Sequence, residues 1–125
     1  MISYVSNTIP SVSQKSLDVQ RDVFAFSIQL KAARSLMGWS QAEVAKRSGV
    51  ARPTVARIEA LMMQPRLDTV GKLKKAFLEG GLQILDGQPP GGFSLIISEP
   101  VLQALWQGQL KKKENDTPSS ATDTG

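Results

Sequence analysis

Lysine and arginine residues are concentrated in one segment of this 125-residue chain, and these are the residue types that bind phosphate. Residues 31–75 hold ten of them against three acidic residues, a net charge of +7, whereas the whole chain carries +4. Such a segment is typical of a protein that binds a polyanion, although a solvated basic face on an ordinary domain would give the same charge.

Other kinds of chemistry have few residues to support them. The chain contains no histidine and no cysteine, so Ser-His-Asp and Cys-His nucleophiles and thiolate- or histidine-bound zinc are excluded within one chain. Eleven acidic residues are spread thinly, with no obvious catalytic pair. We therefore expect no enzymatic activity, no metal and no cofactor.

The two ends of the chain are polar. Serines and a proline in residues 1–16 predict a flexible arm, and residues 114–125, ENDTPSSATDTG, predict a disordered tail. No apolar run approaches the roughly 18–20 residues of a membrane span, and the start of the chain lacks the features of a signal peptide. We expect a cytoplasmic protein with no membrane contact.

Apolar residues recur at three- and four-residue steps between these ends and predict helices. Ser40, followed three residues later by Glu43, forms a capping box at the start of a short helix, and Gly49 marks the turn after it. Two short helices around a glycine-containing turn are typical of a helix-turn-helix. We expect this domain to span residues 17–80, with helices over 17–37, 41–48, 52–60 and 67–79.

After Gly80 and Gly81 the apolar period changes to two. Two short strands, 82–85 and 93–97, flank the turn sequence DGQPPGG and predict a β-hairpin, followed by an amphipathic helix that ends near residue 113. A lone hairpin is marginally stable, so it must pack on the helices or pair with a second copy. We expect residues 81–113 to be a dimerisation element, with Leu82, Ile84, Phe93, Leu95, Ile97 and Trp106 at the interface.

Residues 30–78 resemble the Cro/cI-type (Xre-family) helix-turn-helix regulators, above all in WSQAEVAKRSGVARPTVARIE. The match lies in the order of its motifs: Ser-Gln opening the second helix, Gly49 at the turn, and Ile58-Glu59 closing the third helix. With the hairpin and last helix, this predicts a mainly α fold. We expect a lambda-repressor-like bundle of four to five helices with a small C-terminal β-hairpin and a final amphipathic helix.

The resemblance implies that helix 52–60 enters the DNA major groove. Arg52 and Arg57 are then expected to contact bases, because arginine has paired donors that match guanine O6 and N7, and Pro53 offers an apolar contact. Two exposed arginines would also serve solubility alone. Expected phosphate contacts, which fix the register on DNA without reading sequence, are Gln41, Thr54, Gln64 and Arg66.

The resemblance further implies a structural ion pair between Arg34 and Glu59. The sequence departs from the family pattern at Ala51, where a serine or threonine usually caps the third helix. It departs again at Ala60 and Leu61, which replace the glycine that usually ends that helix, so the helix is expected to run longer. Apolar bulk in Leu61-Met62-Met63 leaves the following loop's geometry open.

The predicted function is that of a bacterial or phage transcriptional regulator, in the first place a repressor. It would bind a palindromic operator as a homodimer, with half-sites about one helical turn apart. The alternative is an antitoxin that binds its operator and a toxin protein, based on a loose resemblance to HipB-type antitoxins. A scaffold that uses this fold only for protein contacts is a third interpretation.

Overall fold

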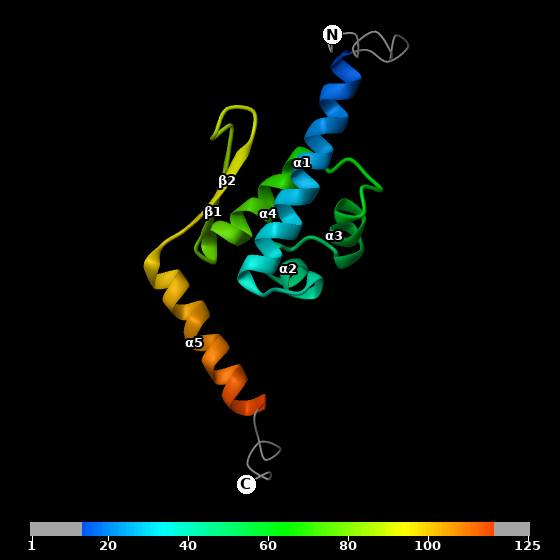
Figure 1. Ribbon diagram of the computed structural model, residues 1–125. Helices are drawn as coiled ribbons and strands as arrows, with labels where there is room; N and C mark the ends of the chain where they lie inside the picture. The colour runs from blue at the N-terminus through cyan, green and yellow to red at the C-terminus, as the bar shows by residue number, and fades with distance from the viewer. Residues whose placement is uncertain (1–13, 117–125) are drawn as a thin grey trace. The chain divides into compact units, whose positions relative to one another are not determined.

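The computed structural model describes residues 14–116, with side chains from 16 to 115, as five helices and two strands (Figure 1). The chain divides into two compact units, Met1–Leu73 and Lys74–Gly125. The described part is mainly helical and lambda-repressor-like, which confirms the predicted fold class. In chain order the elements are α1 (Gln14–Met37), α2 (Gln41–Ser48), α3 (Arg52–Glu59), α4 (Leu67–Glu79), β1 (Leu82–Asp86), β2 (Phe93–Ile97) and α5 (Glu99–Asp116).

The first and last helices are longer than predicted. Helix α1 begins at Gln14 rather than after Ser16, because Gln14 and Lys15 are good helix formers and nothing there breaks the helix. Helix α5 continues to Asp116, into the segment expected to be a tail. The remainder of the predicted arm and tail, residues 1–13 and 117–125, lies outside the described residues.

Gly49 ends α2 as predicted, whereas only the Ser40 half of the predicted capping box is present, because the Glu43 side chain bonds to Arg47 instead. The Ser40 hydroxyl accepts a hydrogen bond from the Glu43 N–H at 3.0 Å, and the Glu43 carboxylate pairs with Arg47 one turn later, at 2.7 Å from its Nε. Gly49 ends the helix with φ +79°, and its N–H donates to the Ala45 carbonyl at 2.9 Å. This left-handed residue is what allows the sharp turn towards α3.

Helix α3 does not run longer, as the missing glycine had led us to expect. It ends at Glu59, and Leu61 takes the left-handed conformation with φ +60°. The Leu61 N–H donates to the Ile58 carbonyl at 3.1 Å, and the Met62 N–H donates to the Arg57 carbonyl at 2.8 Å. These two bonds form a Schellman motif, which satisfies the last carbonyls of the helix with a leucine where glycine is usual.

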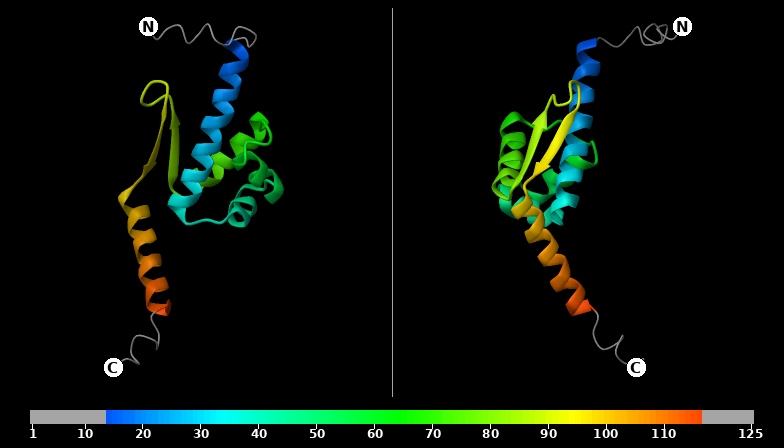
Figure 2. Two further views of the ribbon diagram at one scale, coloured as in Figure 1. Left: turned by 45° about the vertical axis from the view of Figure 1, so that its right-hand side comes forward. Right: turned by 60° about the vertical axis from the view of Figure 1, so that its left-hand side comes forward.

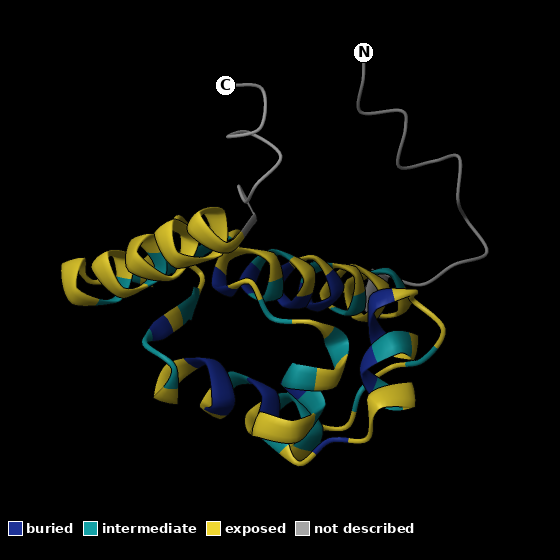
Figure 3. Ribbon diagram, turned by 90° about the horizontal axis from the view of Figure 1, so that it is seen from below, coloured by how far each residue is buried: buried dark blue, intermediate teal, exposed yellow. Residues whose placement is uncertain are grey.

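The core of the first unit consists of one stripe from each helix, drawn as dark blue bands in Figure 3. Both α1 and α2 contact α3, so two other helices hold α3 in place. On α1, apolar residues at three- and four-residue steps are buried over residues 26–37. The buried residues are Phe26, Leu30, Ala33 and Met37 on α1, Val44 on α2, Val55 and Ile58 on α3, and Leu73 on α4.

The second unit contains an antiparallel hairpin, whose strands run side by side in both views of Figure 2. Leu82 lies opposite Ile97 and Ile84 opposite Leu95, so these four side chains share one face. Gly81 precedes β1 with φ +101°, and a Cβ there would lie 2.4 Å from Val101 Cγ2 on α5. A side chain at position 81 would therefore disturb the contact between the hairpin and α5.

Candidate nucleic-acid interface

Two fully buried residues set the orientation of α3. Val55 and Ile58 point into the core of the first unit, and on a helix of only eight residues they fix which side faces solvent. Arg52, Pro53 and Arg57 are all exposed. The structure thus brings the three predicted base-contacting residues to the solvent-facing side of one short helix.

The guanidinium groups of Arg52 and Arg57 are available to a ligand. Among the described residues, neither group forms a hydrogen bond or an ion pair. They are five positions apart in the sequence, which on a helix is about 7.5 Å along the axis and about 140° around it. Both reach one groove only if α3 lies along the groove rather than across it.

The predicted phosphate-contacting residues are in different surroundings. Gln64 is exposed and Thr54 is half-buried. Arg66 is exposed and approaches Asp68 at 3.7 Å, a long and solvated contact. Gln41 uses its amide nitrogen to donate to Glu59 Oε1 at 3.0 Å, so only its second amide hydrogen remains for a phosphate.

Arg34 and Glu59 form a two-bond ion pair between α1 and α3. Arg34 Nε and Nη2 lie 2.8 and 2.9 Å from Glu59 Oε2 and Oε1, and Nη1 donates to the Trp39 carbonyl at 3.2 Å. The Glu59 side chain is 6% exposed and that of Arg34 is 26% exposed. The hydrogen bond to Glu59 raises the pKa of Arg34 against the opposing effect of burial.

Glu59 is held at its backbone as well as at its carboxylate. The buried Ser27 hydroxyl on α1 donates to the Glu59 carbonyl at 3.1 Å. Together with Arg34 and Gln41, this fixes the end of α3 to both α1 and α2. The sequence did not predict the contacts of Ser27 and Gln41 with Glu59. For Ser27 the one available signal was its position as a polar residue next to Phe26, which is buried.

Arg47 is engaged in a way that the sequence did not predict. Its guanidinium carbon lies 4.1 Å from the centroid of the Trp39 ring, in addition to the ion pair with Glu43. This cation–π contact joins Trp39, two positions before the start of α2, to the last turn of α2. Arg47 is therefore less available for a phosphate than its exposed neighbour Lys46.

The predicted dimer residues separate into two groups. Leu82 is fully buried within the single chain, so it has no surface left for a partner, and we remove it from the interface. The sequence pattern placed Leu82 in a strand but did not show that its own chain covers the side chain. Half-buried or exposed side chains remain at Ile84, Phe93, Leu95, Ile97 and Trp106.

The described residues show few features of other kinds of site. They hold no group of three or more His, Cys, Asp or Glu side chains that could bind a metal ion. Within the same part of the chain, no helix combines the length and the apolar character needed to cross a membrane.

Comparison with known proteins gives one finding. A family model described as Helix-turn-helix matches residues 30–77, which run from the middle of α1 to the end of α4 and include Arg34, Glu59 and all of α2 and α3. A comparison of the chain with curated proteins gave no match. The matched segment is within one residue of the segment that resembles the Xre family. Residues 30–77 are therefore a Cro/cI-type helix-turn-helix domain, a domain of DNA-binding transcription regulators.

Proposed function

We propose that the protein is a sequence-specific regulator that binds double-stranded DNA as a homodimer and reads the major groove with α3. The observation that carries this proposal is the exposure of Arg52 and Arg57 on a helix whose opposite side is buried through Val55 and Ile58. Glu59 supports it, because its contacts hold α3 rigidly in the first unit.

Each exposed side chain of α3 has a chemistry suited to the groove. Arg52 and Arg57 can each donate two hydrogen bonds to guanine O6 and N7, and Pro53 offers an apolar surface to a thymine methyl group. Around them, donors to phosphate set the position of the helix on the duplex without reading sequence. We assign that role to Gln41, Thr54, Gln64 and Arg66.

Two copies are needed because one helix of eight residues reaches only a few base edges. A dimer doubles the contacts and matches a palindrome whose half-sites are about 34–36 Å apart. Repression is the simplest outcome, since a dimer seated on an operator blocks other proteins from the same DNA.

The test is selection of bound fragments from random duplex DNA. We expect a palindrome with guanines in each half-site and a spacing of about 10 base pairs. Enrichment of no sequence over the input pool would contradict specific recognition by α3.

A second candidate function is that of an antitoxin, whose C-terminal helix engages a toxin while the first unit binds the operator. The exposed apolar side chains of α5, Leu102, Trp106 and Leu110, support it. A gene for a kinase-like or nuclease toxin beside this one, and a stable complex of the two purified proteins, would favour this function over simple regulation.

A further inference from the structure

Helix α5 carries an apolar stripe that is exposed among the described residues. Leu102, Trp106 and Leu110 are 57%, 53% and 40% exposed, and four-residue spacing places them on one side of the helix. The other side begins with Val101, which packs beside Gly81. A helix of 18 residues gains most of its stability from packing of an apolar side, and exposed apolar stripes of this kind are typical of surfaces that contact a partner.

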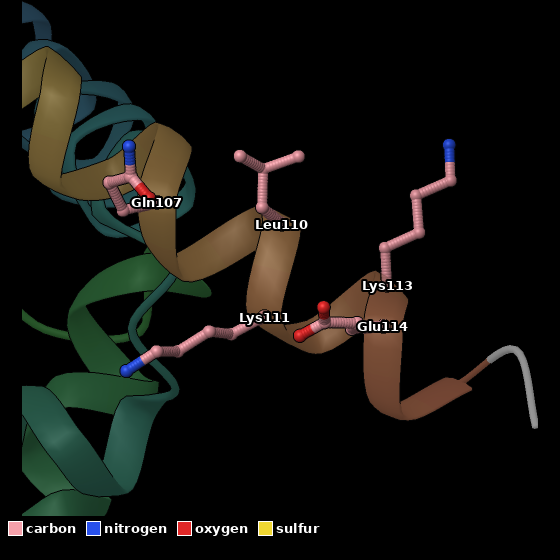
Figure 4. Close-up of a pocket in the computed structure, with 5 residues that line it drawn as sticks. All are labelled: Gln107, Leu110, Lys111, Lys113 and Glu114. Carbon is pink, nitrogen blue, oxygen red and sulfur yellow. The ribbon is translucent and has the colours of Figure 1, made fainter.

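Two charged residues extend the same stripe. At about 100° per residue, Glu99 and Lys113 fall within the arc that the three apolar residues define, whereas Lys111 falls on the opposite side. Figure 4, which draws the residues around an open pocket on α5, shows Leu110 and Lys113 projecting to one side and Lys111 to another. The stripe thus has an acidic end, an apolar middle and a basic end.

Two copies of this stripe are complementary to each other when the two helices run in opposite directions. If two α5 helices pack antiparallel with Trp106 at the centre, Leu102 of one copy faces Leu110 of the other. In the same register Glu99 faces Lys113 at both ends. A parallel arrangement would instead place residues 111–113, three lysines, beside the same three lysines of the other copy, which is repulsive.

We propose that the α5 stripe is an interface between two copies of this chain, antiparallel, with the two-fold axis at Trp106. A two-fold interface requires one patch that complements itself, and this stripe meets the requirement in both charge and apolar pattern. The proposal rests on the homodimer of the proposed function and names its interface. The order of charges along the stripe favours a second copy over a toxin. A second copy always carries the complementary order when it is reversed, whereas the surface of a toxin need not.

The absence of cysteine makes a crosslinking test direct. Two variants, Glu99→Cys and Lys113→Cys, are prepared as full chains, mixed, and treated with a short bifunctional maleimide. We expect a covalent dimer of twice 13.5 kDa in the mixture and little in either variant alone, because like positions then lie about 21 Å apart. Lys111→Cys replaces Lys113→Cys as the matched control and should crosslink weakly.

Three results would overturn the proposal. Efficient crosslinking of Lys113→Cys with itself would indicate parallel helices. Equal crosslinking of Lys111→Cys and Lys113→Cys with Glu99→Cys would show that no defined side of α5 is at the contact. Lack of any dimer product in the mixture would place the contact away from α5.

A charge exchange tests the same register without crosslinking. Lys113→Glu and Glu99→Lys should each weaken dimerisation about three- to tenfold, since each creates two like-charged contacts per dimer. The double variant should restore it, while Lys111→Glu should leave it unchanged. Sedimentation equilibrium measures the dissociation constant, and a double variant weaker than either single variant would contradict the pairing.

These experiments separate the interface from DNA recognition. If the α5 variants leave the dissociation constant of the dimer unchanged while Arg57→Ala still weakens operator binding, this interface is wrong and the proposed function stands. If the α5 variants weaken both dimerisation and operator binding while Arg57→Ala has no effect on DNA, the interface stands and the recognition by α3 is wrong.

Discussion

Arg34 and Glu59 join α1 to α3 through two parallel hydrogen bonds of 2.8 and 2.9 Å. Because Glu59 is the last residue of α3, the pair acts directly on the helix that presents Arg52 and Arg57. A planar guanidinium facing a carboxylate has little freedom to rotate. The pair therefore restricts the angle at which α3 meets DNA as well as stabilising the domain.

Removal of the arginine should be strongly destabilising. Arg34→Met leaves the nearly buried Glu59 carboxylate without its charge partner, so we expect the free energy of unfolding to fall by about 3–5 kcal/mol. Urea denaturation measures it. Arg66→Met, which breaks the exposed contact to Asp68, is the control and should cost less than about 1 kcal/mol. Equal effects of the two variants would contradict a buried pair.

The stabilisation by this pair should not depend on pH in the ordinary range. The bond to Glu59 raises the pKa of Arg34 above its usual value, so the contribution is fully present below the pKa of the unfolded state. It is lost only as the pH rises through the higher folded-state pKa. The difference in unfolding free energy between the parent chain and Arg34→Met should thus stay constant from pH 7 to pH 10. A difference that shrinks within this range would contradict the assignment.

Leu61 should carry a measurable backbone strain. With φ +60°, its Cβ costs about 1–2 kcal/mol relative to glycine. We expect Leu61→Gly to be more stable than Leu61→Ala by about 1 kcal/mol in urea denaturation, because the two differ only in the Cβ. If the alanine variant is the more stable, the residue does not hold the left-handed conformation.

Gly81 should tolerate a side chain less well than another glycine of the hairpin. Gly81→Ala adds a methyl group 2.4 Å from Val101 Cγ2 at φ +101°, so both strain and overpacking apply, about 2–4 kcal/mol in all. Gly87 has φ +78° with no neighbour within 4 Å of an added Cβ, and Gly87→Ala should show the strain alone. Thermal unfolding followed by circular dichroism compares the two. Equal losses would mean that α5 does not pack at Gly81.

Local signals explain how much of this fold the sequence predicted. The Ser40 cap, Gly49 and the apolar stripe of α1 depend on neighbours within one or two turns, so their sequence pattern sufficed. The predicted end of α3 was wrong. The hydrogen bonds that the Leu61 and Met62 N–H groups donate to helix carbonyls outweighed the preference of leucine against the left-handed conformation. The cost of one left-handed leucine is smaller than that of leaving the helix end unsatisfied.

Contacts between distant residues account for what the sequence missed at the site. The bonds of Gln41 and Ser27 to Glu59 span 18 and 32 residues, and no periodicity encodes such a pair. The Arg34–Glu59 contact came from a family resemblance rather than from spacing. Which side of α3 faces solvent, by contrast, is fixed within the helix itself by the apolar residues Val55 and Ile58, because a buried stripe sets the rotation of its helix.

The assignment of roles on the DNA surface leads to a comparison of two arginines. Arg57→Ala should cost about 1–3 kcal/mol on the selected operator and leave binding to random DNA nearly intact, because base contacts specify. Arg66→Ala should weaken binding to both DNAs alike and lower the slope of log K against log salt by about 1, because a phosphate contact releases one counterion. Fluorescence anisotropy at several salt concentrations measures both quantities. A uniform loss for Arg57→Ala on both DNAs would reassign Arg57 to the phosphate backbone, and a salt slope unchanged by Arg66→Ala would remove Arg66 from it.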